Sequence, residues 1–169
     1  NKDLISVFSF LFLKEKCRHC QSKIPKEVFM TEILMGILLV LAALKSGIFD
    51  NFQPSILNFL ILTAIFAAIL LISVYDLKHF IIPDSFLVFL FIFSFVYLLL
   101  FQSLSFSFFL SLLISAVILA APFLLIFLIS RGRWFGLGDV KYIATLGFFL
   151  GLARGMSAVI LAFWIGAIV

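Results

Sequence analysis

The sequence predicts an all-α membrane protein, a polytopic bundle of about five to six transmembrane helices. Hydrophobic residues make up 65% of the 169 residues and charged residues only 12%, whereas a soluble domain carries about 25% charged residues. The hydrophobic residues gather in runs near the roughly 20 residues that one spanning helix requires. These runs lack the apolar and polar alternation of a membrane β-barrel, so helices are the spanning elements.

The spans follow one another between short polar clusters, and their edges are placed to within about 2–4 residues. Four long spans are predicted at about 28–45, 55–75, 85–102 and 107–130. A shorter apolar helix follows at about 140–151, and a last one at about 156–169. Residues 1–27 hold nine of the 20 charged residues and form an extramembrane segment. The predicted domains are therefore this segment at 1–27 and a transmembrane bundle at 28–169.

Both ends of the chain read as cut. The chain begins at Asn1 instead of Met, and it stops at Val169 within an apolar run. The sequence therefore predicts a fragment whose bundle is truncated at its C-terminal end.

Positive charge orients the bundle. If the spans alternate, all of the twelve Lys and Arg residues except Lys45 and Arg154 fall on one side of the membrane. Cytoplasmic loops carry the excess of Lys and Arg, so this side is predicted to face the cytoplasm. The net charge of +4 then reflects topology and contact with anionic lipid headgroups, not nucleic acid.

Two carboxylates stand at the edges of predicted spans on this cytoplasmic side. Asp76 follows the span at 55–75, and Asp139 lies in the sequence Phe135-Gly136-Leu137-Gly138-Asp139-Val140-Lys141. An ionisable side chain at the edge of hydrocarbon is costly, which makes each a candidate functional group. Structural interpretations stay open: Asp76 is a polar stop where a helix leaves the bilayer, and Asp139 is a helix N-cap.

The neighbouring residues sharpen this choice. Gly136 and Gly138 permit unusual backbone conformations and let another backbone approach closely, which favours a peptide-binding site beside Asp139. Asp84, in Pro83-Asp84-Ser85, is interpreted as turn and capping chemistry at the start of the next span. Lys141 is interpreted as a headgroup anchor, and the alternative is that its charge lowers the pKa of a neighbouring Asp.

The two carboxylates together predict a reaction. Carboxylates close together cannot both ionise cheaply, so they share one proton. The ionised partner takes a proton from water, and the protonated partner polarises a scissile carbonyl. The pair therefore predicts an aspartyl protease.

The stretch Gly136-Leu137-Gly138-Asp139-Val140-Lys141 resembles the GxGDxK pattern of the prepilin peptidases, the type IV leader peptidases among the GxGD intramembrane aspartyl proteases. Asp76 followed by Ile82-Pro83-Asp84 is similar to the family's other signature. Cys17-Arg18-His19-Cys20 resembles the second half of the family's cytoplasmic cysteine region. The resemblance covers nearly the whole chain.

This resemblance implies that Asp76 and Asp139 are the catalytic pair and that Gly136, Gly138 and Lys141 support the catalytic loop. The implied substrates are prepilin or pseudopilin precursors of type IV pilus and type II secretion systems. Cleavage of their short basic leader falls after a Gly, just before an apolar helix. The implied location is the bacterial inner (cytoplasmic) membrane, with membrane lipid around the bundle and the active site facing the cytoplasm.

The resemblance also bears on cofactors. Proteolysis by an Asp dyad requires none. The family often carries two Cys-x-x-Cys pairs that together hold one Zn²⁺, whereas Cys17 and Cys20 alone do not fill a four-ligand site. Either a second pair lies in a longer chain, or this pair does not hold zinc firmly. Many members also methylate the new N-terminus with S-adenosylmethionine, and this chain lacks the N-terminal span and loop that accompany that activity.

Two other functions remain open at this stage. A polytopic transporter or secretion-complex subunit could use Asp76 and Asp139 to relay ions or protons. A structural or assembly subunit could carry them only as helix-end markers.

Overall fold

The computed structural model describes residues 26–48, 52–102 and 105–168, and all regular structure in these ranges is helical. By the length and composition of its residues, each of the five described helices is a candidate membrane span. This confirms the predicted all-α, polytopic fold. The helices are α2 (Lys26–Ser46), α3 (Phe52–His79), α4 (Asp84–Phe101), α5 (Phe106–Ser130) and α6 (Leu137–Ile168).

Turn residues set several helix boundaries. Ser105 is the N-cap of α5, where its side chain accepts a hydrogen bond from the Phe108 amide, as capping serines do. Pro83 is the N-cap of α4, and its extended backbone leads into the first turn. Arg131 ends α5 in the left-handed conformation, followed by Gly132 with φ 75°. These polar breaks are the positions at which the sequence leaves one apolar run and starts the next.

The chain forms two compact units that divide between Leu70 and Leu71, inside α3. The first unit contains α2 and the first part of α3. Ala42 of α2 and Ile65 of α3 are fully buried, and the Asn58 side-chain amide donates a hydrogen bond to the Ser46 carbonyl at 3.5 Å. This bond ties the end of α2 to the beginning of α3.

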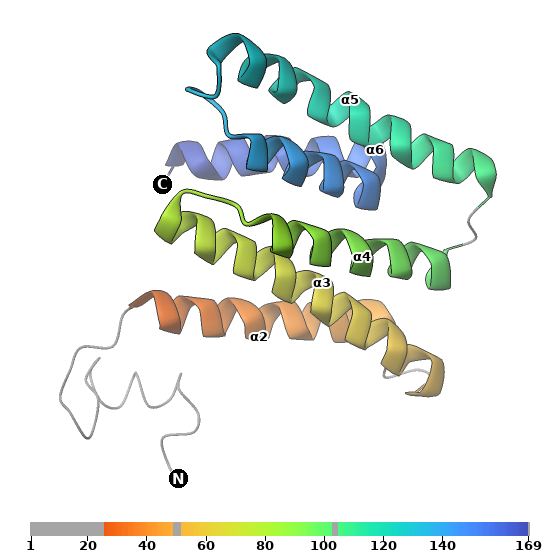
Figure 1. Cartoon of the computed structure of the whole chain (residues 1–169). Coiled ribbons are helices and arrows are strands. Elements are labelled where there is room, and N and C mark those ends of the chain that lie inside the picture. Colours follow the sequence, from red (N-terminus) through yellow and green to blue (C-terminus); the bar gives the residue numbers. More distant parts are fainter. Residues whose placement is uncertain (1–25, 49–51, 103–104, 169) are drawn as a thin grey trace, which may run out of the picture. The chain divides into compact units, whose positions relative to one another are not determined.

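The second unit contains the last part of α3 and the helices α4, α5 and α6. Helix α6 packs against both α5 and α4 and lies between them (Figure 1). One end of this unit has an apolar core in which Leu98 of α4, Leu112 of α5 and Phe148 of α6 are buried together. This core joins the three helices at the end away from Asp139.

Helix α6 is bent into two arms at Gly151. The backbone of Gly151, with φ 75° and ψ 177°, departs from helical values, and only glycine adopts such angles readily. The first arm, residues 137–150, is about 21 Å long at about 1.5 Å per residue, shorter than the roughly 30 Å hydrocarbon core. The second arm runs back beside the first (Figure 1). This confirms the predicted break between two short helices near residue 151.

Gly147 allows α6 to lie directly on the backbone of α5. A Cβ atom on Gly147 would lie 3.0 Å from Ala116 Cα and 3.2 Å from the Ser115 carbonyl oxygen. We therefore expect Gly147→Val to lower the stability of the second unit by about 1–3 kcal/mol, because the overpacked helices must separate. The measurement is the unfolding midpoint of the purified protein in detergent.

Gly36→Val in α2 is the matched control for this substitution. A Cβ atom on Gly36 would meet no heavy atom within 4 Å, so the same side chain adds no clash there. Equal midpoints for the two variants would contradict a close approach of α5 and α6 at Gly147.

Candidate functional site

Asp76 lies in the last turn of α3. The predicted span ended at residue 75, whereas the helix continues to His79, so Asp76 lies within the helix. The Phe80 amide donates a hydrogen bond to the Asp76 carbonyl at 2.7 Å, and Phe80 has φ 53°. This is the left-handed cap that commonly closes a helix. The cap fixes the direction in which the chain leaves Asp76.

Asp139 lies in the first turn of α6. Its Oδ2 accepts a hydrogen bond from the Gly136 amide at 3.2 Å. Gly136 is the N-cap and Asp139 the third residue of the helix, and a side chain at that position commonly accepts from the N-cap amide. The expectation that Asp139 could itself be the N-cap is therefore wrong, because the helix already begins at Leu137. A Cβ atom on Gly136 would lie 2.9 Å from the same Oδ2. Gly136 thus leaves the room that the Asp139 carboxylate occupies.

The second unit brings the two carboxylates to one end of the bundle. Asp76 lies at the end of α3 and Asp139 in the first turn of α6, and both adjoin the connection between α3 and α4. Gly138 faces the connection between α3 and α4, and a Cβ atom on Gly138 would lie 3.1 Å from Ile82 Cβ. The missing side chain of Gly138 therefore lets the segment after Asp76 rest on the segment that carries Asp139.

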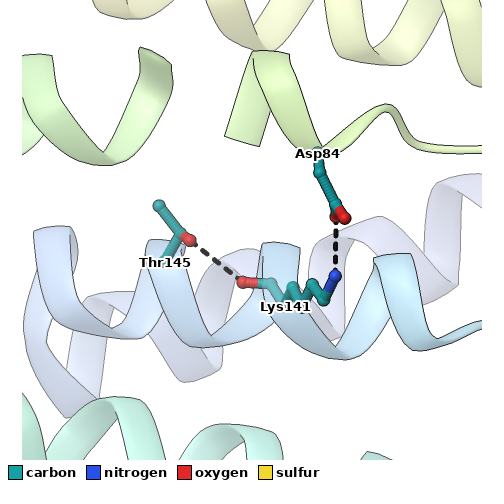
Figure 2. Close-up of polar contacts among 3 residues, drawn as sticks. All are labelled: Asp84, Lys141 and Thr145. Atoms are coloured by element: carbon teal, nitrogen blue, oxygen red, sulfur yellow. Dashed lines mark hydrogen bonds and ion pairs between the residues drawn. The ribbon is translucent and has the colours of Figure 1, made fainter. Parts of the chain in front are cut away.

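Lys141 contacts α4 at the same end. Its Nζ donates to Asp84 Oδ1 at 2.7 Å (Figure 2). Asp84 was predicted to cap α4, but Pro83 is the N-cap and no side chain caps this helix. The carboxylate of Asp84 reaches across to α6 instead, and Lys141 is engaged with protein, not extended toward lipid headgroups.

An apolar pocket of about 660 Å³ opens beside Asp139, between the two arms of α6. Asp139 and Tyr142 supply polar groups to its wall. The opposite wall carries Ala158, Ala162 and Gly166 of the second arm. Phe123 of α5 stacks on residues of both walls, with its ring centroid 5.1 Å from that of Phe135 and 5.7 Å from that of Phe163. The arrangement offers a carboxylate at the side of an apolar space.

Two protein-family models match parts of the chain. Residues 63–169 match the type IV leader peptidase family, and residues 1–46 match the bacterial Peptidase A24 N-terminal domain. The chain belongs to the type IV leader peptidase family. This confirms the family that the sequence motifs indicated.

A similar member of this family is the prepilin leader peptidase/N-methyltransferase of Bacillus subtilis (strain 168). It is 28% identical to the chain over 168 residues, which are 98% of this chain and 62% of that protein. The chain thus spans about three-fifths of that relative's length. No solved structure matches the chain.

The cysteine pair of this family member lies outside the residues that the structure describes. Cys17 and Cys20 precede Lys26, where the description begins. Within the described ranges, no group of three or more His, Cys, Asp or Glu side chains is placed to hold a metal ion. The zinc expectation therefore rests on the sequence resemblance alone.

Sequence reasoning missed two parts of the site. The first is the small-residue wall of the pocket, although Ala158, Ala162 and Gly166 recur every fourth residue, which places them on one helix face and is a readable signal. The second is the pairing of Asp84 with Lys141. These residues lie 57 positions apart, and no local pattern in the sequence joins them.

Proposed function

We propose that this leader peptidase family member is a membrane-embedded aspartic endopeptidase that removes the basic leader from type IV prepilin-like precursors. The observation that carries the proposal is the close approach of Gly138, next to Asp139, to Ile82 in the connection that follows Asp76. Family membership supports a peptidase that processes prepilin-type substrates.

The two carboxylates hydrolyse the peptide bond with one proton between them. The ionised carboxylate takes a proton from a water molecule, whose oxygen attacks the scissile carbonyl carbon while the protonated carboxyl hydrogen-bonds to the carbonyl oxygen. The tetrahedral intermediate collapses as a carboxyl proton passes to the leaving nitrogen. The products are a leader with a new carboxyl terminus and a mature chain with a new amino terminus. The pH profile belongs to the pair, not to either residue.

In this proposal the pocket receives the start of the precursor's apolar helix. Its apolar walls suit the start of the precursor's apolar helix, and close packing between membrane helices favours small residues such as Ala158, Ala162 and Gly166. Asp139 stands in the wall of the same space. The helix of the precursor thus stays in the bilayer while the bond just before it meets the carboxylates.

The environment follows from the same assignment. The active site faces the cytoplasm at the inner membrane, because the segments that carry Asp76 and Asp139 adjoin the Lys- and Arg-rich side. Proteolysis uses no cofactor. In a longer chain, Cys17 and Cys20 would supply two of four Zn²⁺ ligands. Methylation of the new amino terminus would require S-adenosylmethionine, and no residue described above is assigned to it.

The proposal predicts one cut at a defined place. When the chain in lipid vesicles is incubated with a precursor bearing a basic leader, a Gly and an apolar helix, we expect cleavage after the Gly. Replacing that Gly by Phe should lower the cleavage rate by about 10²-fold, because a bulky residue displaces the scissile bond from the carboxylates. Mass spectrometry of both products locates the cut.

A precursor whose leader lysines are replaced by glutamine is the control for recognition of the basic leader, because the scissile bond of this precursor is unchanged. Cuts scattered through the apolar helix would contradict the proposal. So would an intact precursor together with an ion flux across the vesicles that depends on the two carboxylates, which is the behaviour of a transporter.

A further inference from the structure

The connection between Asp76 and Asp84 is short and held at its beginning. Helix α3 ends at His79, Phe80 turns with φ 53°, and α4 begins at Asp84. The Phe80 amide binds the carbonyl of Asp76 itself. The Tyr75 ring also packs edge-on against the ring of Phe86 at a centroid distance of 5.9 Å, which joins the end of α3 to the start of α4. Asp84 is therefore joined to the turn that carries Asp76 by a short connection and by the packing of Tyr75 on Phe86.

The first arm of α6 presents two different faces at this end. Asp139, Tyr142 and Leu146 share the face that lines the pocket, as residues three, four and seven positions apart do on a helix. Gly138 and Lys141, three positions apart, share another face, which meets the connection between α3 and α4. Lys141 is two positions from Asp139, a spacing at which side chains do not face each other. Lys141 is therefore turned toward Asp84 and away from the pocket.

Two contacts hold the α3–α4 connection against α6. One is the approach of Ile82 to Gly138, and the other is the 2.7 Å ion pair of Lys141 with Asp84 (Figure 2). The side chains of Lys141 and Asp84 are 45% and 69% exposed, and exposed pairs contribute little to stability. The ion pair therefore acts by fixing the relative positions of two chain segments, not by adding stability. The pair joins the two chain segments whose ends carry Asp76 and Asp139.

We propose that Asp84 and Lys141 are positioning residues whose ion pair sets the approach of Asp76 to Asp139. This inference rests on the proposed function, in which those two carboxylates carry the reaction. Neither Asp84 nor Lys141 touches the substrate. They act through the backbone, Asp84 by way of the connection to Asp76 and Lys141 by way of the first turn of α6.

The test compares variants that remove, reverse or swap the charges of Asp84 and Lys141. Their cleavage kinetics are measured in lipid vesicles with the same basic-leader precursor. We expect Asp84→Asn to lower kcat by about 10-fold or more with KM nearly unchanged, because misplacement by about 1 Å costs up to about 10²-fold in rate. Asp84→Lys should lower kcat further, since two ammonium groups then repel. Asp84→Lys combined with Lys141→Asp should recover at least 10-fold over Asp84→Lys alone. Asp84→Glu should retain more activity than Asp84→Asn.

Arg133→Gln is the control for the loss of an exposed charge outside the ion pair. Arg133 is an exposed cation in the connection between α5 and α6, and its removal should leave kcat and KM unchanged. All rates are expressed per folded enzyme, so that a change in abundance does not register as a change in kcat.

Hydrogen exchange provides a readout that does not depend on catalysis. The amides of Phe80 and Val140 bind the carbonyls of Asp76 and Gly136. The amide hydrogens in peptides 76–84 and 134–142 should exchange faster in Asp84→Asn, because local opening follows the loss of contacts. In the double variant Asp84→Lys with Lys141→Asp, their rates should return toward those of the parent protein.

The outcomes separate the two proposals. Unchanged exchange in Asp84→Asn, an unchanged kcat per folded enzyme, or no recovery by the double variant would each overturn the positioning role. If the exchange rates follow the ion pair but the parent protein cleaves no precursor, the two segments are positioned as inferred and the peptidase assignment fails.

Discussion

Asp76→Asn and Asp139→Glu should each reduce leader cleavage by at least about 10³-fold, within the range that acid and base groups contribute to enzymatic proton transfer. Asn preserves the shape of the Asp76 side chain but can neither hold nor release the proton that the pair must share. Glu preserves the charge at position 139, but its extra methylene shifts the carboxylate from the place set by the Gly136 amide. The measurement is the rate of leader release in vesicles, followed by gel shift and mass spectrometry.

Glu32→Gln is the control for the loss of a carboxylate. Glu32 lies in α2 and belongs to neither aspartate motif, and we expect parental cleavage from this variant. Each variant must also reach the membrane in parental amounts. Retained cleavage by either Asp variant would rule out the dyad, and the structural interpretation of that residue as a helix-end group would then stand.

Gly138→Val should lower cleavage by about 10²-fold, the cost of displacing reacting groups by about 1 Å. The reason is steric. A Cβ atom at position 138 already lies 3.1 Å from Ile82 Cβ and 3.6 Å from the Ile82 carbonyl oxygen, and the methyl groups of Val extend farther. The connection between α3 and α4 must then move away from α6 and carry Asp76 with it. The initial rate of leader release measures the effect.

Substitutions of graded size at position 138 sharpen this prediction. Gly138→Ala adds only the 3.1 Å contact, which a shift of a few tenths of an ångström relieves, so we expect only a several-fold loss. Gly36→Val again serves as the control for adding Val at a glycine, since its Cβ meets no neighbour. Equal rates for Ala and Val at position 138 would show that the approach of Ile82 does not govern the reaction.

The order of the helices was predictable because it depends on one-dimensional properties. Apolar runs of about 20 residues dictate spanning helices, and polar clusters place their ends to within a few residues. The break in α6 was predictable for a similar reason, since the apolar run around Gly151 is interrupted by a polar patch that includes Arg154. The end of α3 was less accurate. In the sequence, Asp76 marks the end of the apolar run. The helix nevertheless continues through three further residues, because its backbone hydrogen bonds do not require apolar side chains.

The side-chain pairing of Asp84 was not predictable. Asp after Pro at the start of a helix is a common capping pattern, and local sequence contains nothing that distinguishes a cap from a long-range ion pair. Here Pro83 already fills the N-cap position, which leaves the Asp84 carboxylate free to reach Lys141.

The sequence by itself determined the helical membrane fold, the two aspartate motifs and the family, because hydrophobic length, charge and short motifs are properties of the chain. Only the tertiary structure decided which groups meet. It showed that Gly136 makes room for the Asp139 carboxylate, that Gly138 receives Ile82, and that Lys141 pairs with Asp84. The contacts of Gly138 and Lys141 join segments far apart in the sequence, and their distances are set by the packing of α6 against its neighbours, which no local pattern encodes.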